Sequence, residues 1–338
     1  MHDPLQSRRQ RIGALLPLAD GVLLVAAGEP VPLPEGSDQT YPFRAHADYL
    51  YLAGHDEPGG VLAFDPREQS EAHGGWQLFT PPVSEAERVW EGRTHSPGRP
   101  IGELSLWLSA RPARPLALLG APPCGPLPSP DTALSVQVRA ALLHGRRPKD
   151  AQEIATVRRA VVATAAGYAL LPNLIRPGVT ERQVQIELEA GFFRSGGQRT
   201  GYATIVGGGP NAAVLHFPPS ERAIRAGEFV LVDAGAEVAR YTADVTRTYV
   251  AGSPTPFQQD LHQLVLLAGE RAIGRCRPGV EWKSIHLAAA VDLVEGLVAM
   301  GVMRGHPESL VEQEAHTLFF PHGLGHMVGL GVRDAGGL

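Results

Sequence analysis

Apolar residues in the first 145 positions occur as short runs separated by turn-forming residues. Short apolar runs bounded by Gly, Pro or Asp are typical of buried strands. A helical pattern precedes the first of these runs. The predicted strands are Val22 to Ala26, Gly60 to Phe64, Trp76 to Phe79 and Pro115 to Leu119. Residues 1–145 are therefore predicted to form a small α/β domain.

The pattern changes after residue 145, where helical periods of apolar residues extend over about 150 to 171 and 180 to 195. The second region also contains a weak internal repeat between predicted helices. Ile175 to Glu181 (IRPGVTE) is echoed by Cys276 to Trp282 (CRPGVEW), and helical patterns flank both segments. Pro-Gly is also an ordinary turn between helices, so the echo has a simpler alternative. We predict a second, α+β domain over residues 146–338, with two related helical halves around a sheet.

Two aspartates dominate the chemistry of this second domain. Asp233 ends the run Val-Leu-Val-Asp, and Asp244 opens the run Asp-Val-Thr-Arg-Thr. Both runs favour strands, and Gly235 to Arg240 is the predicted turn between them. In such a hairpin the two carboxylates share a face. Like charges that meet on one buried face are destabilising, and a bound cation removes the conflict.

Downstream, Pro321-His322-Gly323-Leu324-Gly325-His326 offers imidazoles in a glycine-rich loop. Carboxylates and imidazoles together predict a divalent metal site. Two alternatives stay open on the residues alone. Asp233 could be an ordinary turn residue and Asp244 a solvated strand residue, or Arg247 could neutralise either one by a salt bridge.

Composition narrows the class of partner. The 338 residues suit two domains of unequal size, 43% are apolar and 19% charged, and the net charge is −5 without a basic block. Nucleic acid is therefore not expected as a partner. The glycine run Gly207 to Gly209 lacks the Lys-Ser or Lys-Thr of a phosphate loop. A small molecule is the expected partner.

The expected location is the cytoplasm, without a membrane. Cys124 and Cys276 lie far apart and in no metal-like spacing, so neither a disulfide framework nor an oxidising compartment is expected. The N-terminal apolar stretch is interrupted by Pro17, Asp20 and Gly21, which does not fit a targeting segment. From the sequence, we expect no apolar run to reach the roughly 18–20 residues that span a bilayer.

From Tyr202 onward the chain resembles the pita-bread metallopeptidases, and among them the Xaa-Pro peptidases, which comprise proline dipeptidase and aminopeptidase P. The resemblance rests on five motifs in this order: Ile205-Val206-Gly207-Gly208-Gly209-Pro210-Asn211, His216, Val232-Asp233-Ala234-Gly235, Tyr241 to Thr248, and His322-Gly323-Leu324-Gly325-His326. Tyr41 to Arg44 and Tyr49 to Gly54, before Glu57-Pro58, resemble the companion N-terminal domain of the same peptidases. Methionine aminopeptidases share the catalytic fold but lack so large an N-terminal domain.

The resemblance implies a role for each matching residue. Asp233, Asp244 and His326 would bind two divalent ions, with Asp244 bridging them, and Mn²⁺ is expected ahead of Zn²⁺ or Co²⁺. A hydroxide between the ions would attack the bond before proline. His216 and His322 would hold the substrate and stabilise the oxyanion. Arg333 stands where the family has a further histidine and would grip the substrate differently.

The expected activity is a Xaa-Pro dipeptidase of the prolidase type, acting on peptides with proline in second position. The alternatives are an aminopeptidase P that acts on longer peptides and a non-catalytic peptide-binding module. The resemblance also implies a homodimer or larger homo-oligomer. The chain ends at Leu338, before the region where the family supplies two further glutamate ligands. We therefore expect a truncated form of an active enzyme, which on its own binds metal weakly and cleaves little.

Overall fold

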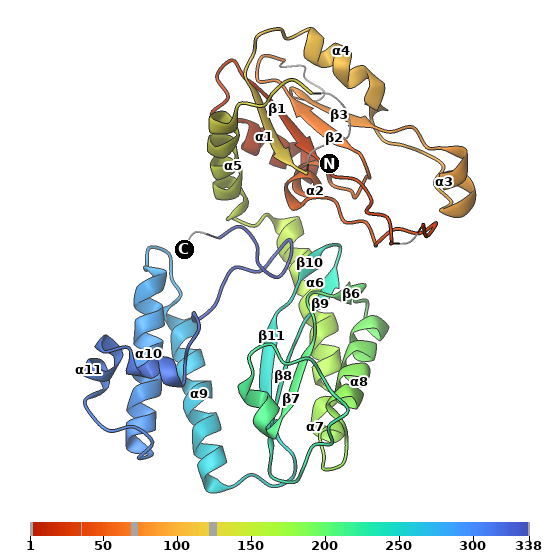
Figure 1. The fold of residues 1–338 in the computed structure, drawn as a ribbon. Helices are drawn as coiled ribbons and strands as arrows, with labels where there is room; N and C mark the ends of the chain where they lie inside the picture. The colour runs from red at the N-terminus through yellow and green to blue at the C-terminus, as the bar shows by residue number, and fades with distance from the viewer. Residues whose placement is uncertain (1–2, 35, 69–73, 122–126, 337–338) are drawn as a thin grey trace. The chain divides into compact units, whose positions relative to one another are not determined.

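The computed structural model describes residues 3–34, 36–68, 74–121 and 127–336, and the chain divides into two compact units between Gln152 and Glu153 (Figure 1). The sequence predicts this boundary at residue 145. The structure places it later because the connecting residues belong to the first unit. Asp150 forms an ion pair with Arg8 at 2.6 Å, and the Lys149 ammonium donates to the Arg146 carbonyl. Cys124 lies outside the described residues.

The first unit is built on a five-stranded sheet in the order β4-β3-β2-β1-β5. β1 pairs with β2 antiparallel and with β5 parallel, so the predicted α/β character is confirmed. The strands are β1 (Val22–Ala26), β2 (Val61–Phe64), β3 (Trp76–Thr80), β4 (Arg99–Pro100) and β5 (Leu116–Gly120). The helices are α1 (Pro4–Gly13), α2 (Ala47–Ala53), α3 (Glu85–Trp90), η1 (Ile101–Glu103), α4 (Leu104–Ser109) and α5 (Thr132–Arg146).

A buried ion cluster ties the end of β2 to the loop before β5. The Asp65 carboxylate is 3% exposed and accepts hydrogen bonds from the guanidinium groups of Arg111 and Arg114, each at 2.7 Å. Burial by itself disfavours the ionised form of Asp65. The hydrogen bonds from Arg114, from the Arg67 backbone N–H and from Arg111 nevertheless hold its pKa well below the usual range.

The second unit begins with α6 (Ala151–Tyr168), α7 (Leu171–Leu174) and α8 (Glu181–Arg194), which lie against a sheet (Figure 1). The sheet has the order β11-β8-β7, and a second three-stranded sheet has the order β10-β9-β6. The strands are β6 (Arg199–Thr200), β7 (Ile205–Gly208), β8 (Phe229–Ala234), β9 (Ala236–Val238), β10 (Tyr241–Thr242) and β11 (Val245–Val250). Short helices are η2 (Gly209–Ala213), α11 (Pro307–Glu312) and η3 (Ala315–Leu318).

The two copies of the internal repeat adopt the same local structure. After α7, Gly178 takes a φ of +93° and Thr180 caps α8; after α9 (Pro256–Arg275), Gly279 takes a φ of +84° and Glu281 precedes α10 (Trp282–Ala299). A positive φ is readily adopted only by glycine, so the Pro-Gly pair sets both turns. Each helical half therefore contains the predicted helix–turn–helix.

The segment Ala151–Leu174 departs from the sequence prediction about membranes. It is 24 residues long and is long and apolar enough, by length and composition, to cross a membrane. In the structure α6 buries Ala160, Ala163 and Thr164, and its Tyr168 hydroxyl donates to the Val232 carbonyl of β8 at 3.2 Å. The core accounts for this buried face of α6, whereas Ile154, Val161 and Val162 on its other faces are 42%, 45% and 65% exposed.

Candidate active site

The pairing of β8 with β11 brings Asp233 and Asp244 onto one face of the sheet. Along β8, Val230, Val232 and Ala234 are buried, whereas Asp233 lies on the opposite, half-buried face. The strand is therefore fully buried on one face and partly exposed on the other. Asp233 pairs with Thr246, so Asp244, two residues before Thr246, lies diagonally across from it rather than opposite.

The chain between the two aspartates is a second small hairpin and not the single turn that the sequence predicts. β9 and β10 pair, and the reversal is confined to Ala239 and Arg240, whose φ angles are +47° and +71°. Gly235 lets the chain pass from β8 into β9. A Cβ at this position would lie 1.7 Å from the Ala243 carbonyl oxygen, so no other residue fits without moving the backbone.

A tyrosine that the motifs do not single out holds the two carboxylates together. The Tyr202 hydroxyl approaches Asp233 Oδ1 at 2.5 Å and Asp244 Oδ1 at 2.9 Å. Burial of the ring raises the pKa of Tyr202, and its hydrogen bonds to the ionised aspartates raise it further. The sequence gives no local signal for this contact, because 31 and 42 residues separate the partners.

Burial also raises the pKa of Asp233. The neighbouring Asp244 charge raises it further, whereas the Tyr202 hydrogen bond and the electrostatic effect of His216 lower it. A half-buried carboxylate beside a second carboxylate is a site where a cation is favourable. Arg247, the alternative partner, donates instead to the Thr246 carbonyl at 2.8 Å and forms no ion pair with either aspartate in the described part of the chain.

His326 reaches Asp244 because its loop is attached to the edge of the β9–β10 hairpin. The Thr242 N–H donates to the Gly329 carbonyl and the Gly331 N–H donates to the Arg240 carbonyl, each at 3.0 Å. His326 Nε2 consequently lies 3.3 Å from Asp244 Oδ2. The structure thus brings the three predicted ligands Asp233, Asp244 and His326 to one place.

These side chains line a polar cavity of about 690 Å³. His216 and Arg333, two residues predicted to bind the substrate, lie in its wall. Residues of α8 that the motifs do not include also line it. The other residues of the wall are Arg182, Gln185, Glu189, Thr200, Tyr202, Ala203, Thr204, Ile205, Phe217, Pro218, Pro219 and Val332.

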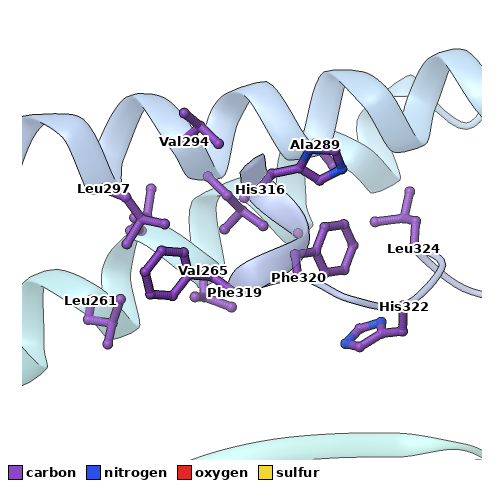
Figure 2. A pocket seen from close by; sticks show the side chains of 14 residues that line it. Leu261, Val265, Ala289, Val294, Leu297, His316, Phe319, Phe320, His322 and Leu324 are labelled. Atoms are coloured by element: carbon purple, nitrogen blue, oxygen red, sulfur yellow. The ribbon is translucent and has the colours of Figure 1, made fainter. Parts of the chain in front are cut away.

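His322 is not brought to this cavity. It lines a separate apolar cavity of about 450 Å³ between α9 and α10, with Phe320 and Leu324 beside it (Figure 2). Its ring packs edge-on against Phe320, with 4.9 Å between the ring centroids. The two glycines between His322 and His326 allow the loop to direct the two imidazoles to different places. His322 therefore lines a different cavity from the other predicted site residues, and its role in binding substrate stays a prediction.

The glycine run Gly207 to Gly209 is not a phosphate loop. The Gly208 N–H donates to the Glu181 carboxylate at 2.8 Å, and Gly209 begins the short helix η2. An N–H that already serves a buried carboxylate is not free for an anion. The nucleotide-binding alternative is therefore not supported.

The donor set at the cavity has the chemistry of a divalent metal site. Two carboxylates and one imidazole suit Mn²⁺, Zn²⁺ or Co²⁺. Among the residues that the structure describes, no three His, Cys, Asp or Glu side chains are gathered closely enough to hold an ion as they stand. The residue types nevertheless suit a divalent metal. In this structure the Tyr202 hydroxyl is hydrogen-bonded to both carboxylates and lies between them.

Comparisons with known proteins agree with these features. The model of metallopeptidase family M24 matches residues 155–337, and that of the aminopeptidase P N-terminal domain matches residues 5–100. The Xaa-Pro aminopeptidase of Haemophilus influenzae is 30% identical, with 99% of this chain and 81% of that protein covered. That of Escherichia coli K12 is 29% identical, with 98% and 81% covered.

Solved structures give the same result. The Pseudomonas aeruginosa aminopeptidase PepP matches with a TM-score of 0.83 at 25% identity, over 99% of this chain and 82% of that chain. Proline aminopeptidase P II from Yersinia pestis matches with a TM-score of 0.81 at 28% identity, over 99% and 83%. The predicted α+β fold, with its N-terminal domain and pita-bread catalytic domain, is confirmed. The model of metallopeptidase family M24 matches more than half of this chain, so the chain belongs to that family.

Proposed function

We propose that this protein is a Xaa-Pro aminopeptidase, which removes the N-terminal residue from peptides with proline in second position. The observation that carries the proposal is the convergence of Asp233, Asp244 and His326 on one polar cavity. Relatives with this activity, alike along nearly the whole chain, support it. They support the aminopeptidase alternative over the prolidase-type dipeptidase, which is the first expectation from the sequence.

Membership of a metallopeptidase family implies divalent metal ions. Asp233, Asp244 and His326 would hold two such ions. When bound, the ions lower the pKa of water and polarise a peptide carbonyl. Mn²⁺ is the proposed ion, with Zn²⁺ and Co²⁺ as alternatives.

The remaining residues of the cavity would bind and orient the peptide. His216 lines the same cavity as Asp233, and its imidazole would donate a hydrogen bond to the carbonyl of the reacting bond as negative charge develops there. Arg333 and Arg182 provide fixed positive charges for the carbonyl groups or the carboxylate of the peptide. Glu189, on the same wall, provides a carboxylate for its N-terminal amine.

Metal titration tests the ligand set. We expect binding of Mn²⁺ to raise the thermal unfolding temperature of the wild-type chain, and expect Asp233→Asn, Asp244→Asn and His326→Ala each to lose this increase. Glu187→Gln is a matched control, since Glu187 is half-exposed on α8 and does not line the cavity. An equal temperature increase in all variants would contradict the assignment.

Peptide cleavage then tests the activity. We expect slow but measurable release of the first residue from Ala-Pro-Ala, still slower release from Ala-Pro, and none from Ala-Ala-Ala. Faster cleavage of Ala-Pro than of Ala-Pro-Ala would favour the dipeptidase activity instead. Metal binding without cleavage of any of the three would favour the non-catalytic module.

We further propose a cytoplasmic enzyme that forms a homodimer or larger homo-oligomer, which light scattering and cell fractionation can test.

A further inference from the structure

A single buried carboxylate holds both ends of the segment that carries His216. Glu181 is 0% exposed. Its Oε1 accepts hydrogen bonds from the Gly208 N–H and the Asn211 amide, both at 2.8 Å. Its Oε2 accepts from the Ser220 N–H at 3.1 Å and the Ser220 hydroxyl at 2.5 Å. Two donors precede His216 in the sequence and two follow it.

The segment between these donors has little else to fix it. Val214 and Leu215 are 51% and 57% exposed, and His216 is exposed as well. Before the segment, β7 is paired with β8 as far as Gly208. After it, the chain pairs with the residues around Glu181, where the Arg182 N–H donates to the Ser220 carbonyl at 2.9 Å. The carboxylate therefore closes the base of a loop whose outer part projects toward the cavity.

The chemistry of Glu181 suits this task. An ionised carboxylate has about four acceptor positions, and four donors occupy them here. Glu181 is the first residue of α8, where the helix dipole favours a negative charge. Hydrogen bonds to a buried charge are stronger than those between neutral groups, and removing one partner costs more stability.

We infer that Glu181 is a positioning residue, which acts on the reaction through His216 by fixing where the loop presents the imidazole. Phe217, Pro218 and Pro219 of the same loop line the cavity, so the clamp also sets part of the cavity wall. The kinetic consequence rests on the proposed function, whereas the hold of Glu181 on the loop does not.

The decisive variant is Glu181→Gln, which keeps the shape but replaces one acceptor oxygen by an NH₂ group that faces donors. We expect hydrogen exchange of the amides from Asn211 to Ser220 to rise about tenfold, the effect of losing one hydrogen bond to a charge. In the metal-loaded enzyme kcat should fall by up to about 100-fold with little change in KM, since a small misplacement of one group has this effect.

A double-mutant cycle separates positioning from general destabilisation. In a His216→Ala background, Glu181→Gln should cause no further loss of kcat, because its effect acts through the missing imidazole. Glu187→Gln, the same change on an exposed face of α8, should alter neither exchange nor kcat. Ser220→Ala, which removes one donor, provides a milder variant if Glu181→Gln fails to fold.

Each result decides the matter. Unchanged exchange from Asn211 to Ser220 would overturn the clamp whatever the activity. Equal losses of kcat with and without His216 would overturn its action through that residue. If the wild-type enzyme cleaves no peptide, the proposed function fails separately, and the imidazole NMR signals of His216 decide instead. Signals that do not differ between wild type and Glu181→Gln would then overturn the inference.

Discussion

At the residue scale, the candidate active site is governed by one hydroxyl between two carboxylates. Tyr202 approaches both Asp233 and Asp244, while the charge of Asp244 adds to the burial that raises the pKa of Asp233. The hydroxyl supplies a single proton to two acceptors, so it reduces their repulsion without cancelling a charge. A divalent cation would cancel the charge, which makes Tyr202 important chiefly in the metal-free protein.

Tyr202→Phe should therefore destabilise the metal-free protein by about 1–3 kcal/mol at neutral pH, the range for losing hydrogen bonds to charged groups. Urea denaturation in the presence of a chelator measures this. Saturating metal should reduce the loss. Tyr249→Phe is the control, because the Tyr249 hydroxyl has no hydrogen-bond partner in the described part of the chain. Equal stability of Tyr202→Phe and the wild type would contradict the role of the hydroxyl.

At the scale of elements, the site depends on a crossing of two strands. β8 continues into β9 and β10 returns into β11, and the two passages touch at Gly235 and Ala243. Asp233 and Asp244 lie within two residues of this contact. The position of the aspartates is therefore set by backbone packing at the crossing as well as by their own hydrogen bonds.

Gly235→Ala should destabilise the second unit by about 3 kcal/mol or more, because overpacking forces the backbone apart. It should also abolish the metal-induced rise in unfolding temperature. Gly269→Ala, in α9 and without neighbouring atoms within 4 Å, should instead stabilise the protein by about 0.5–1 kcal/mol, as alanine does in a helix. Thermal unfolding of both variants checks the contrast, and a tolerated Gly235→Ala would refute the crossing.

Elements that follow from local pattern could be predicted from the sequence, whereas those that depend on distant partners could not. The apolar runs gave β1, β2, β3 and β5, because a buried strand needs apolar residues and turns at its ends. The short β9 and β10 lack such a pattern. Glu181 and Tyr202 join segments tens of residues apart, and the His322 ring packs against Phe320 at a separate cavity, for which the motif gives no sign.

At the scale of the whole molecule, the two units should respond to acid in opposite ways. The pKa of Asp65 in the first unit is depressed on folding, so its contribution is present above the unfolded pKa of about 3.9 and is lost as the pH falls below it. The pKa of Asp233 in the second unit is raised. Its contribution is present at low pH and is lost as the pH rises through the folded pKa.

Calorimetry of the metal-free protein between pH 7 and pH 3 should therefore show the first unit losing stability relative to the second. Asp65→Asn should remove much of this pH dependence and cost the first unit about 3–5 kcal/mol at pH 7, since it leaves Arg111 and Arg114 without their buried partner. Asp20→Asn, at a 74% exposed side chain, should change little. Parallel shifts of both units with pH would argue against this account.

The apolar character of α6 has a consequence for synthesis on the ribosome. Its Tyr168 binds the Val232 carbonyl of β8, 64 residues later in the chain. At about 5–20 residues per second, the nascent helix waits roughly 3–13 s for the strand that covers it. During that interval the residues of α6 that later pack on the sheet have no partner, so we expect slower translation to prolong the exposure of this apolar segment.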